Sequence, residues 1–221
     1  MFEKQENIFK DRKDAGEQLG KFLEAKYKNQ NPLIIGIPRG GVEVAYYVAK
    51  QLNAELSLVI SKKLPLPAQK EYGIGAIAEE DSVYIGPSAK GLISDKLIDE
   101  IIKEQKEEVI RRINKYRHGK PLPAMEGRVV ILVDDGIATG VTLVPIVELC
   151  IRRKAAKVVI AAPVSGSRFD ENLYKADEIE IIVKPYSFYA VGQVYEKFGD
   201  FDDDDLLELL AQAEQEQRLR L

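Results

Sequence analysis

An acidic pair followed by a turn of small residues is the part of this sequence whose spacing indicates chemistry. Asp134 and Asp135 end the β-branched run 129–133. The turn behind them reads Gly136, Ile137, Ala138, Thr139, Gly140, Val141 and Thr142. Small residues let the backbone approach an anion, and the amides that open a following helix point at it with the positive end of the helix dipole. Two carboxylates beside such a cradle accept hydrogen bonds from a vicinal diol, so the segment predicts a sugar-phosphate site.

The turn departs from the other common nucleotide-binding patterns. A Walker loop closes with Gly-Lys-Ser/Thr, whereas Gly140 is followed by Val141 and Thr142. The glycines also do not follow the spacing G-x-G-x-x-G of a dinucleotide fingerprint. An ordinary strand-to-helix turn after an acidic strand end is the alternative interpretation. It accounts for parts of the pattern only.

A second turn with anion-binding character lies near the start of the chain. Pro38, Arg39, Gly40 and Gly41 separate an apolar run at 33–37 from a helical pattern at 42–52. Two glycines beside an arginine at a strand end favour an anion site, because the backbone amides and the cation can converge. A turn whose arginine is merely solvated is the alternative.

Scarce residue types exclude several other chemistries. His118 is the only histidine, so a histidine-based hydrolase or zinc site would depend on it alone. It stands in the basic tail 115–118, which we expect to be a solvated helix end. The only cysteine, Cys150, is expected to be a buried small apolar residue, and one cysteine makes no disulfide framework.

The charge balance bears on partners and compartment. Acids outnumber bases by 36 to 32 and the net charge is −4, which argues against non-specific nucleic-acid binding. The first residues are polar, and no apolar run approaches the roughly 18 residues that cross a bilayer. We therefore expect a cytoplasmic protein that binds no membrane.

Apolar periodicity predicts one continuous α/β domain over residues 1–221. Helices are expected over 12–27, 42–52, about 94–117, 143–152 and 206–219, and strands over 33–37, 55–60, 128–133, 157–162 and 179–183. Strand, helix, strand units of this kind build parallel sheets. Proline and glycine between Lys62 and Gly86 predict a mobile hairpin or loop with short β-like runs at 76–78 and 82–85. The acidic run 202–205 suits a helix N-terminus and water.

The acidic pair and its turn resemble the phosphoribosyl pyrophosphate (PRPP) motif of the type I phosphoribosyltransferases. The resemblance is closest to a group of predicted phosphoribosyltransferases whose acceptor is generally unassigned. The residues that carry it elsewhere are Phe9, Asp11, Arg12, Ala15, Gly16, 39–41, 62–64 and 189–192. It implies a three-layer fold with a mostly parallel central sheet flanked by helices. It also implies a flexible hairpin loop at about 62–86, a helical insertion at about 94–118, and a small hood built from the N-terminal segment and about 184–201.

The resemblance implies transfer of the phosphoribosyl group of PRPP to a nitrogen of a nucleobase-like acceptor, with release of pyrophosphate. The phosphate would bind at 136–142 and pyrophosphate at 38–41. Asp134 and Asp135 would contact the ribose hydroxyls, and would contact Mg²⁺ through water, because the metal is held chiefly by the ligand's oxygens. That Asp135 also assists proton removal from the acceptor is a hypothesis.

Lysines of the flexible loop are expected to contribute positive charge to the bound PRPP. The candidates are Lys62, Lys63 and Lys70. Lysines in loops are more commonly just solvated, which is the alternative.

The acceptor site is predicted from the segment 185–195. It resembles the hood segment of the 6-oxopurine phosphoribosyltransferases, in which an aromatic residue and a small apolar-glycine stretch stack on the purine. Phe188 or Tyr189 would then stack on a planar base, while burial in the core is the alternative for such aromatics. The lysine with which the purine enzymes read the exocyclic oxygen has no counterpart in 161–175. That absence disfavours a purine acceptor.

Two other functional classes fit the same cradle. A non-catalytic regulatory protein that senses PRPP or nucleotides would keep the fold, and an appended DNA-binding domain would favour it, but the first helix is too short to be one. A hydrolase acting on a sugar phosphate is the third class. The long helix and the habit of the family predict a homo-oligomer, a dimer, although helical stripes also pack within one chain.

Overall fold

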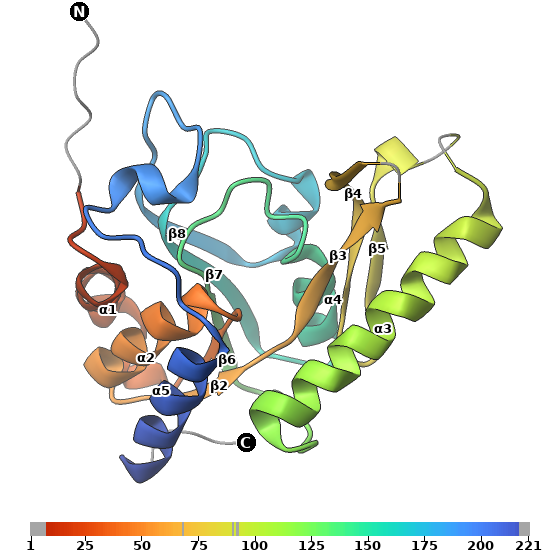
Figure 1. Ribbon diagram of the computed structural model, residues 1–221. Helices are drawn as coiled ribbons and strands as arrows, with labels where there is room; N and C mark the ends of the chain where they lie inside the picture. The colour runs from red at the N-terminus through yellow and green to blue at the C-terminus, as the bar shows by residue number, and fades with distance from the viewer. Residues whose placement is uncertain (1–7, 68, 90, 92, 217–221) are drawn as a thin grey trace, which may run out of the picture.

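A five-stranded sheet forms the centre of the protein (Figure 1). The computed structural model describes residues 8–67, 69–89, 91 and 93–216, without the side chains of 69–72 and 88. The strands are β1 (Leu33–Gly36), β2 (Glu55–Leu58), β6 (Val129–Val133), β7 (Lys157–Val164) and β8 (Glu178–Val183). They lie in the order β2-β1-β6-β7-β8, and every neighbouring pair is parallel. The predicted parallel sheet is confirmed, and its topology places the carboxyl ends of β1 and β6 side by side.

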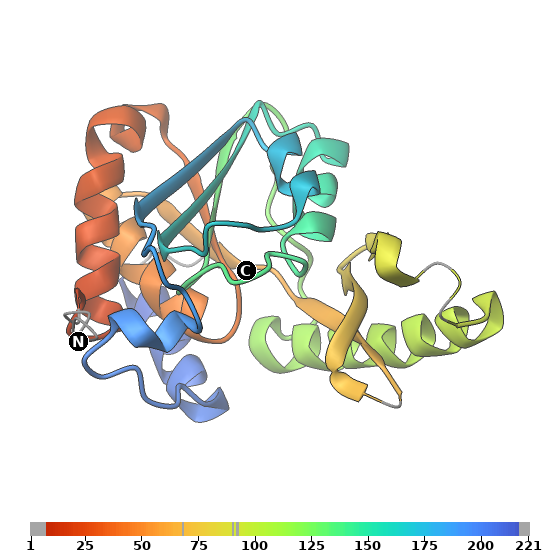
Figure 2. The ribbon, with the colours of Figure 1, turned by 90° about the horizontal axis from the view of Figure 1, so that it is seen from above.

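Helices cover both faces of this sheet (Figure 2). One face carries α1 (Arg12–Tyr27), α2 (Gly40–Leu52) and α5 (Asp203–Gln215), and the other carries α4 (Val144–Arg152) and the 3-10 helix η3 (Glu171–Lys175). Because successive strand residues point to opposite faces, Ile34 and Ile131 pack toward the first group. Ile35 and Leu132 pack toward the second. The three predicted layers follow from this alternation.

Local sequence signals set the helix ends. α1 begins at Arg12, as predicted, because the Asp11 carboxylate accepts the amide of Asp14 at 2.8 Å. The long helix α3 (Asp95–Arg117) begins behind Ser94 and ends at His118, whose backbone is left-handed. Among the described residues, no helix combines the length and the apolar character needed to span a membrane.

A second sheet, antiparallel and three-stranded, lies beside the first and packs on α3 (Figure 2). Its strands are β3 (Ser61–Leu66), β4 (Gln69–Ala78) and β5 (Val83–Ile85). The predicted loop missed β3 and most of β4. Register shifts at Leu64 and Pro65 accommodate the proline, while Leu64 is buried in the same apolar cluster as Val109 of α3. Packing on the helix therefore outweighs the local proline and glycine signal. Movement of this hairpin over a ligand stays a prediction.

A buried ion pair joins the second sheet to the first. Arg117, at the end of α3, is only 1% exposed, pairs with Glu79 and donates to the carbonyl of Leu58 at 3.1 Å. Glu79 also accepts the amide of Ile60 at 2.8 Å. The expectation that the basic tail 115–118 is solvated is therefore wrong for Tyr116 and Arg117, although His118 itself is exposed. Arg117 is buried because it pairs with Glu79, a partner too distant in the sequence for the local pattern to indicate.

The N-terminal segment pairs with a segment near the C-terminus. The amides of Ile8 and Phe9 donate to the carbonyl of Val194 at 2.9 and 3.0 Å. Phe9 in turn accepts the amide of Glu196 at 2.8 Å, and its ring lies 5.5 Å from that of Tyr195. These are the two segments from which a hood is predicted. Their covering of a ligand stays a prediction, as does the assignment of the whole chain to one domain.

Candidate active site

The acid pair and the glycine turn lie against each other at the carboxyl ends of β1 and β6. β1 and β6 are paired in register, so residues 38–41 follow β1 where the acids follow β6. A Cβ on Gly40 would lie 2.1 Å from Asp135 Oδ2, and one on Gly41 would lie 2.7 Å from Asp134 Oδ1. Only glycine leaves room for the two carboxylates. The two turns predicted separately to bind anions are thus parts of one site. The peptide bond between Pro38 and Arg39 is cis.

Asp135 is held by Arg12, a residue to which the sequence pattern assigned no chemical role. Arg12 Nε lies 2.8 Å from Asp135 Oδ2, and the two side chains are 9% and 17% exposed. The guanidinium also donates to the carbonyl of Phe198 at 2.6 Å and lies 4.1 Å above the centre of the Phe198 ring. Tyr195 Oη donates to the carbonyl of Asp135 at 2.6 Å. Arg12 near the start of α1 and the segment 195–198 therefore fix the position of Asp135.

Asp134 differs from Asp135 in its surroundings. Its Oδ1 accepts the amide of Asp135 at 2.9 Å, and the residue lines a cavity. Burial raises the pKa of Asp134 well above its ordinary value, and the neighbouring charge of Asp135 raises this pKa further. The carboxylate of Asp135 is thus paired with a cation, while that of Asp134 lines the cavity without an ion pair among the described residues.

The turn behind the acids encloses a cavity of about 230 Å³. It is lined by Lys63, Asp134 and residues 136–143. The amides of Gly136 and of 138–142 have no acceptor in the part of the chain that the structure describes. The carbonyls are occupied instead: Thr139 accepts the amide of Asp170 at 2.9 Å, and Thr142 accepts the hydroxyl of Ser61 at 2.8 Å. The turn is therefore held from behind with its amide groups free, as an anion cradle requires.

Ile137 is an exception among the predicted phosphate-binding residues. Its amide donates to the carbonyl of Val164 at 2.9 Å, its carbonyl accepts the amide of Gly166 at 3.0 Å, and its side chain is buried. This amide is not available to a ligand, so the prediction needs correction at this position. Ile137 anchors the turn to the end of β7.

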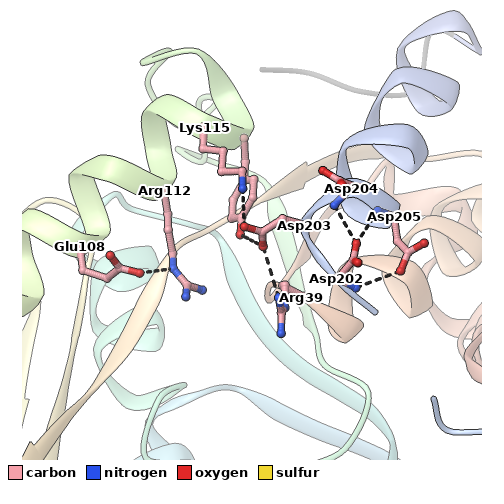
Figure 3. A network of polar contacts seen from close by, with 9 residues as sticks. Arg39, Glu108, Arg112, Lys115, Asp202, Asp203, Asp204 and Asp205 are labelled. Atoms are coloured by element: carbon pink, nitrogen blue, oxygen red, sulfur yellow. Dashed lines mark hydrogen bonds and ion pairs between the residues drawn. The ribbon is translucent and has the colours of Figure 1, made fainter. Parts of the chain in front are cut away.

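Arg39 points toward the N-terminus of α5 rather than lying free in solvent (Figure 3). Its Nη1 lies 3.4 Å from Asp203 Oδ1. Asp203 also pairs with Lys115 at 2.5 Å and accepts the hydroxyl of Tyr116 at 2.6 Å, both on α3. The Lys115 ammonium and the Tyr116 hydroxyl lower the pKa of Asp203 to about 2. The turn at 38–41 is thus connected to α3 and α5 through one carboxylate.

Asp203 contacts Arg39 and α3, whereas Asp202 of the same acidic run 202–205 caps a helix. Asp202 accepts the amides of Asp204 and Asp205 at 2.8 and 3.0 Å and so caps α5, as the prediction of a helix N-terminus requires. The helix begins at Asp203 rather than at Leu206, because this cap lies earlier than the apolar pattern indicated. Its predicted end at Leu219 lies outside the described residues.

The two lysines of β3 face opposite directions. Lys63 lines the cradle cavity. Lys62, the preceding residue on the strand, is half-buried on the other side, and burial, then Arg112, lower its pKa. The side chain of Lys70 lies outside the described residues. The structure thus brings one of the predicted lysines to the cradle.

A wider cavity of about 500 Å³ adjoins the cradle and shares two of its residues. It is lined by Ala138, Thr139, 166–168 and 186–189. Phe188 is half-buried against the cluster that holds Val191, whereas Tyr189 is 89% exposed. Phe188 is therefore partly buried in the core, as the alternative interpretation expects, whereas Tyr189 is not. Both side chains reach a space that can hold a planar ring.

Sequence reasoning missed two residues of this cavity. Tyr186 lines it and is fully exposed. Arg168 lines it too, is exposed, and has no acceptor among the described residues. The sequence holds one signal for Arg168, since it falls in the stretch 161–175, where the resemblance to the purine enzymes predicts a base-reading lysine. A guanidinium can serve the same purpose.

Cys150 is buried, as predicted, and burial raises the pKa of its thiol to about 12. An uncharged thiol in an apolar cluster has no nucleophilic role. Among the described residues, no three histidine, cysteine or acidic side chains gather in a way that could hold a metal ion.

Comparison with known proteins places the chain in a family. The family model described as "Phosphoribosyl transferase domain" matches residues 4–191. Two proteins of Mycobacterium tuberculosis, from strains CDC 1551 and H37Rv, are 35% identical over 209 residues. Their names are "Putative phosphoribosyl transferase MT0597" and the same with Rv0571c. The match covers 93% of this chain and 47% of each relative, so the chain spans about half the length of these relatives.

A solved structure agrees with the sequence match. The crystal structure of TT1426 from Thermus thermophilus superposes with a TM-score of 0.78 at 32% identity, and the match covers 92% of this chain and 98% of that one. The fold resemblance thus extends over most of the chain. On the family match, the sequence identity and this fold, the chain belongs to the phosphoribosyl transferase domain family.

Proposed function

We propose that this chain transfers the phosphoribosyl group of PRPP to a nitrogen of a nucleobase-like acceptor and releases pyrophosphate. One observation carries the proposal. A turn with free amides, an acid pair and a second glycine turn meet at the carboxyl ends of two adjacent parallel strands, and a larger cavity opens beside them. The turn with free amides would bind a phosphate and the acid pair a ribose. The second glycine turn would bind a diphosphate, and the larger cavity would hold a ring.

The cradle at 136–142 would bind the 5′-phosphate. The free amides of Gly136 and of 138–142 and the hydroxyls of Thr139 and Thr142 supply donors, and Lys63 supplies positive charge. Asp134 would accept hydrogen bonds from the ribose hydroxyls, since it lines the same cavity. Pro38, Arg39, Gly40 and Gly41 would bind pyrophosphate at the N-terminus of α2, where the first amides of the helix have no intrahelical partner.

Mg²⁺ fits this site only as a metal carried by the substrate. The described residues offer two adjacent carboxylates, and one of them is already paired with Arg12. Such a set does not make a protein cage for Mg²⁺, which keeps its waters and binds phosphate oxygens. When bound, the metal would neutralise the diphosphate. Asp134 and Asp135 would contact its water shell.

The displacement needs no covalent nucleophile from the protein. The bond from the anomeric carbon to the diphosphate oxygen breaks with its electron pair on the leaving group, and the acceptor nitrogen forms the new bond. The protein would position both partners, exclude water and stabilise the developing charge. The acceptor loses a proton, and the raised pKa of Asp134 suits it to this role better than Asp135, whose charge Arg12 stabilises.

The acceptor would be a planar ring in the cavity formed by 166–168 and 186–189. Phe188 and Tyr189 would stack on it, with Tyr186 beside them. Arg168 would donate to an exocyclic oxygen, because Lys175, the lysine of the stretch 161–175, pairs with Glu148 and does not line this cavity. Cytoplasmic location and a homodimer stay predictions.

The test is PRPP-dependent turnover of a nucleobase panel with Mg²⁺, followed by pyrophosphate release. A transferase requires both substrates, and this is the expected result. Pyrophosphate release from PRPP alone would indicate a hydrolase. PRPP binding by calorimetry without turnover of any base would contradict the proposal and favour a PRPP-sensing protein. Unchanged turnover of Asp135→Asn at saturating PRPP would exclude Asp135 from proton transfer.

A further inference from the structure

Lys62 is a half-buried cation that forms no direct ion pair with a described residue, although the Glu108 carboxylate lies within electrostatic range of it. Its ammonium forms no hydrogen bond or ion pair with the residues that the structure describes. Side chains alternate along β3, so Lys62 points to the side of Leu64, which packs beneath α3, while Lys63 points to the cradle. A charge removed from water without a partner is unfavourable, and its presence calls for an anion.

Arg112 of α3 is a second cation with unused donors. It lies on the same helix face as Lys115 and Tyr116, and its guanidinium is directed to the side where Arg39 lies (Figure 3). Its Nε donates to Glu108 at 2.6 Å, but its two terminal amino groups have no acceptor among the described residues. The side chain is 27% exposed. A guanidinium with two parallel free donors matches phosphate oxygens bidentately.

Arg39 completes a group of three cations from three elements. Lys62 lies within electrostatic range of both Arg112 and Arg39. The acids nearby are shared: Asp203 pairs with Lys115 as well as Arg39, and Glu108 pairs with a second arginine as well as Arg112. The group therefore carries excess positive charge although the whole chain has a net charge of −4.

We propose that Arg112, Lys62 and Arg39 together clamp the diphosphate of PRPP, with α3 supplying the wall opposite the turn at 38–41. The inference rests on the proposed function and assigns to α3 a ligand-binding role beyond packing. As the bond to the anomeric carbon breaks, negative charge grows on the departing diphosphate, and the clamp stabilises that charge. In this arrangement Lys63 binds the 5′-phosphate, and Lys62 binds the diphosphate.

The test is calorimetric titration of the full chain with pyrophosphate and Mg²⁺. Arg112→Met is expected to raise the Kd for pyrophosphate at least about tenfold, since it removes a charge-assisted bidentate contact. Arg111→Met is the matched control, because Arg111 is the adjacent arginine, also pairs with Glu108, and is 77% exposed. Its Kd should stay within about twofold of the wild type.

Two further variants separate charge from fold. Lys62→Met should weaken pyrophosphate binding in the same direction, and Arg112→Lys should retain part of the affinity, with melting curves confirming that each variant folds. Equal affinity of Arg112→Met and wild type overturns the clamp. If the wild type still binds PRPP in that case, the proposed function survives. A wild type that binds neither pyrophosphate nor PRPP overturns both.

Discussion

Arg12 Nε and Asp135 Oδ2 lie 2.8 Å apart although 123 positions separate the two residues in the chain. The pair connects the N-terminal segment to the end of β6. Through Phe198 and Tyr195 it also connects the segment near the C-terminus to the same carboxylate. The geometry of the candidate active site thus depends on residues at both ends of the fold.

Arg12→Gln should lower both stability and activity. It leaves Asp135 partly buried without its cation, which costs about 3 kcal/mol in comparable pairs. Thermal and urea unfolding measure the loss, and steady-state kinetics should show a higher KM for PRPP. Lys13→Gln is the control, because Lys13 is the next residue on α1 and is exposed. In the double variant with Asp135→Asn the losses should be less than additive, and simple additivity would contradict the coupling.

Asp134→Asn should stabilise the protein while it abolishes transfer. The folded-state pKa of Asp134 is raised above its ordinary 3.8, so this group favours the folded state at low pH and loses that contribution as pH rises through the raised pKa. Neutral asparagine removes this cost, and the melting temperature at pH 8 should exceed that of the wild type. In the wild type, kcat/KM should fall as pH drops through the same pKa. A melting temperature lower than wild type at pH 8 would argue against the desolvated carboxylate.

Gly140→Ala should prevent phosphate binding in the cradle. Gly140 has a φ of +71°, and a Cβ there would lie 2.4 Å from Cδ1 of the fully buried Leu173, so either the turn or the packed Leu173 side chain must shift. Gly127→Ala is the matched control, with a φ of +72° and open space around its Cβ position. Both should lose about 1 kcal/mol from the left-handed backbone. Only Gly140→Ala should lose PRPP affinity by calorimetry, and an unchanged affinity would remove the turn from the site.

Asp203→Asn should tighten pyrophosphate binding by a few fold, because the carboxylate competes for Arg39. It should also lower the melting temperature, since contacts with Lys115 and Tyr116 weaken. The pKa of Asp203 is lowered to about 2, so its contribution to stability is complete above its ordinary 3.8 and disappears as pH falls toward 2. Asp204→Asn, in the same helical turn, is the control. Weaker pyrophosphate binding by Asp203→Asn alone would show that Asp203 positions Arg39 rather than competing with the ligand.

Elements with strong local patterns could be predicted from the sequence. The β-branched run ending at Asp134 formed the central strand, and the stripe on α3 and the Asp11 cap gave those helices. The small residues behind Asp135 likewise predicted a turn at the end of β6, and its role as a phosphate cradle stays a prediction. In each case the deciding interactions lie within a few residues of one another, so periodicity and spacing record them.

What escaped prediction depends on contacts between distant segments. Leu64 makes β3 a strand because α3 covers it, which no feature near Pro65 reveals. Arg117 looked solvated because Glu79, its partner, lies 38 positions away. The Ile137 amide was counted as a ligand donor because its acceptor, Val164, lies on another strand.

The buried pairing of Arg117 with Glu79 lies at the base of the lobe made of α3 and the second sheet. The chain enters this lobe just after Leu58, and Arg117 fastens the far end of the lobe's helix to that same carbonyl. The lobe is attached along its side as well, since the Ser82 hydroxyl donates to the carbonyl of Pro145 in α4 at 2.7 Å and Tyr84 donates to Asp170 at 2.7 Å. The strand that carries Lys62 and Lys63 therefore belongs to a lobe that is fixed both at its base and along one side.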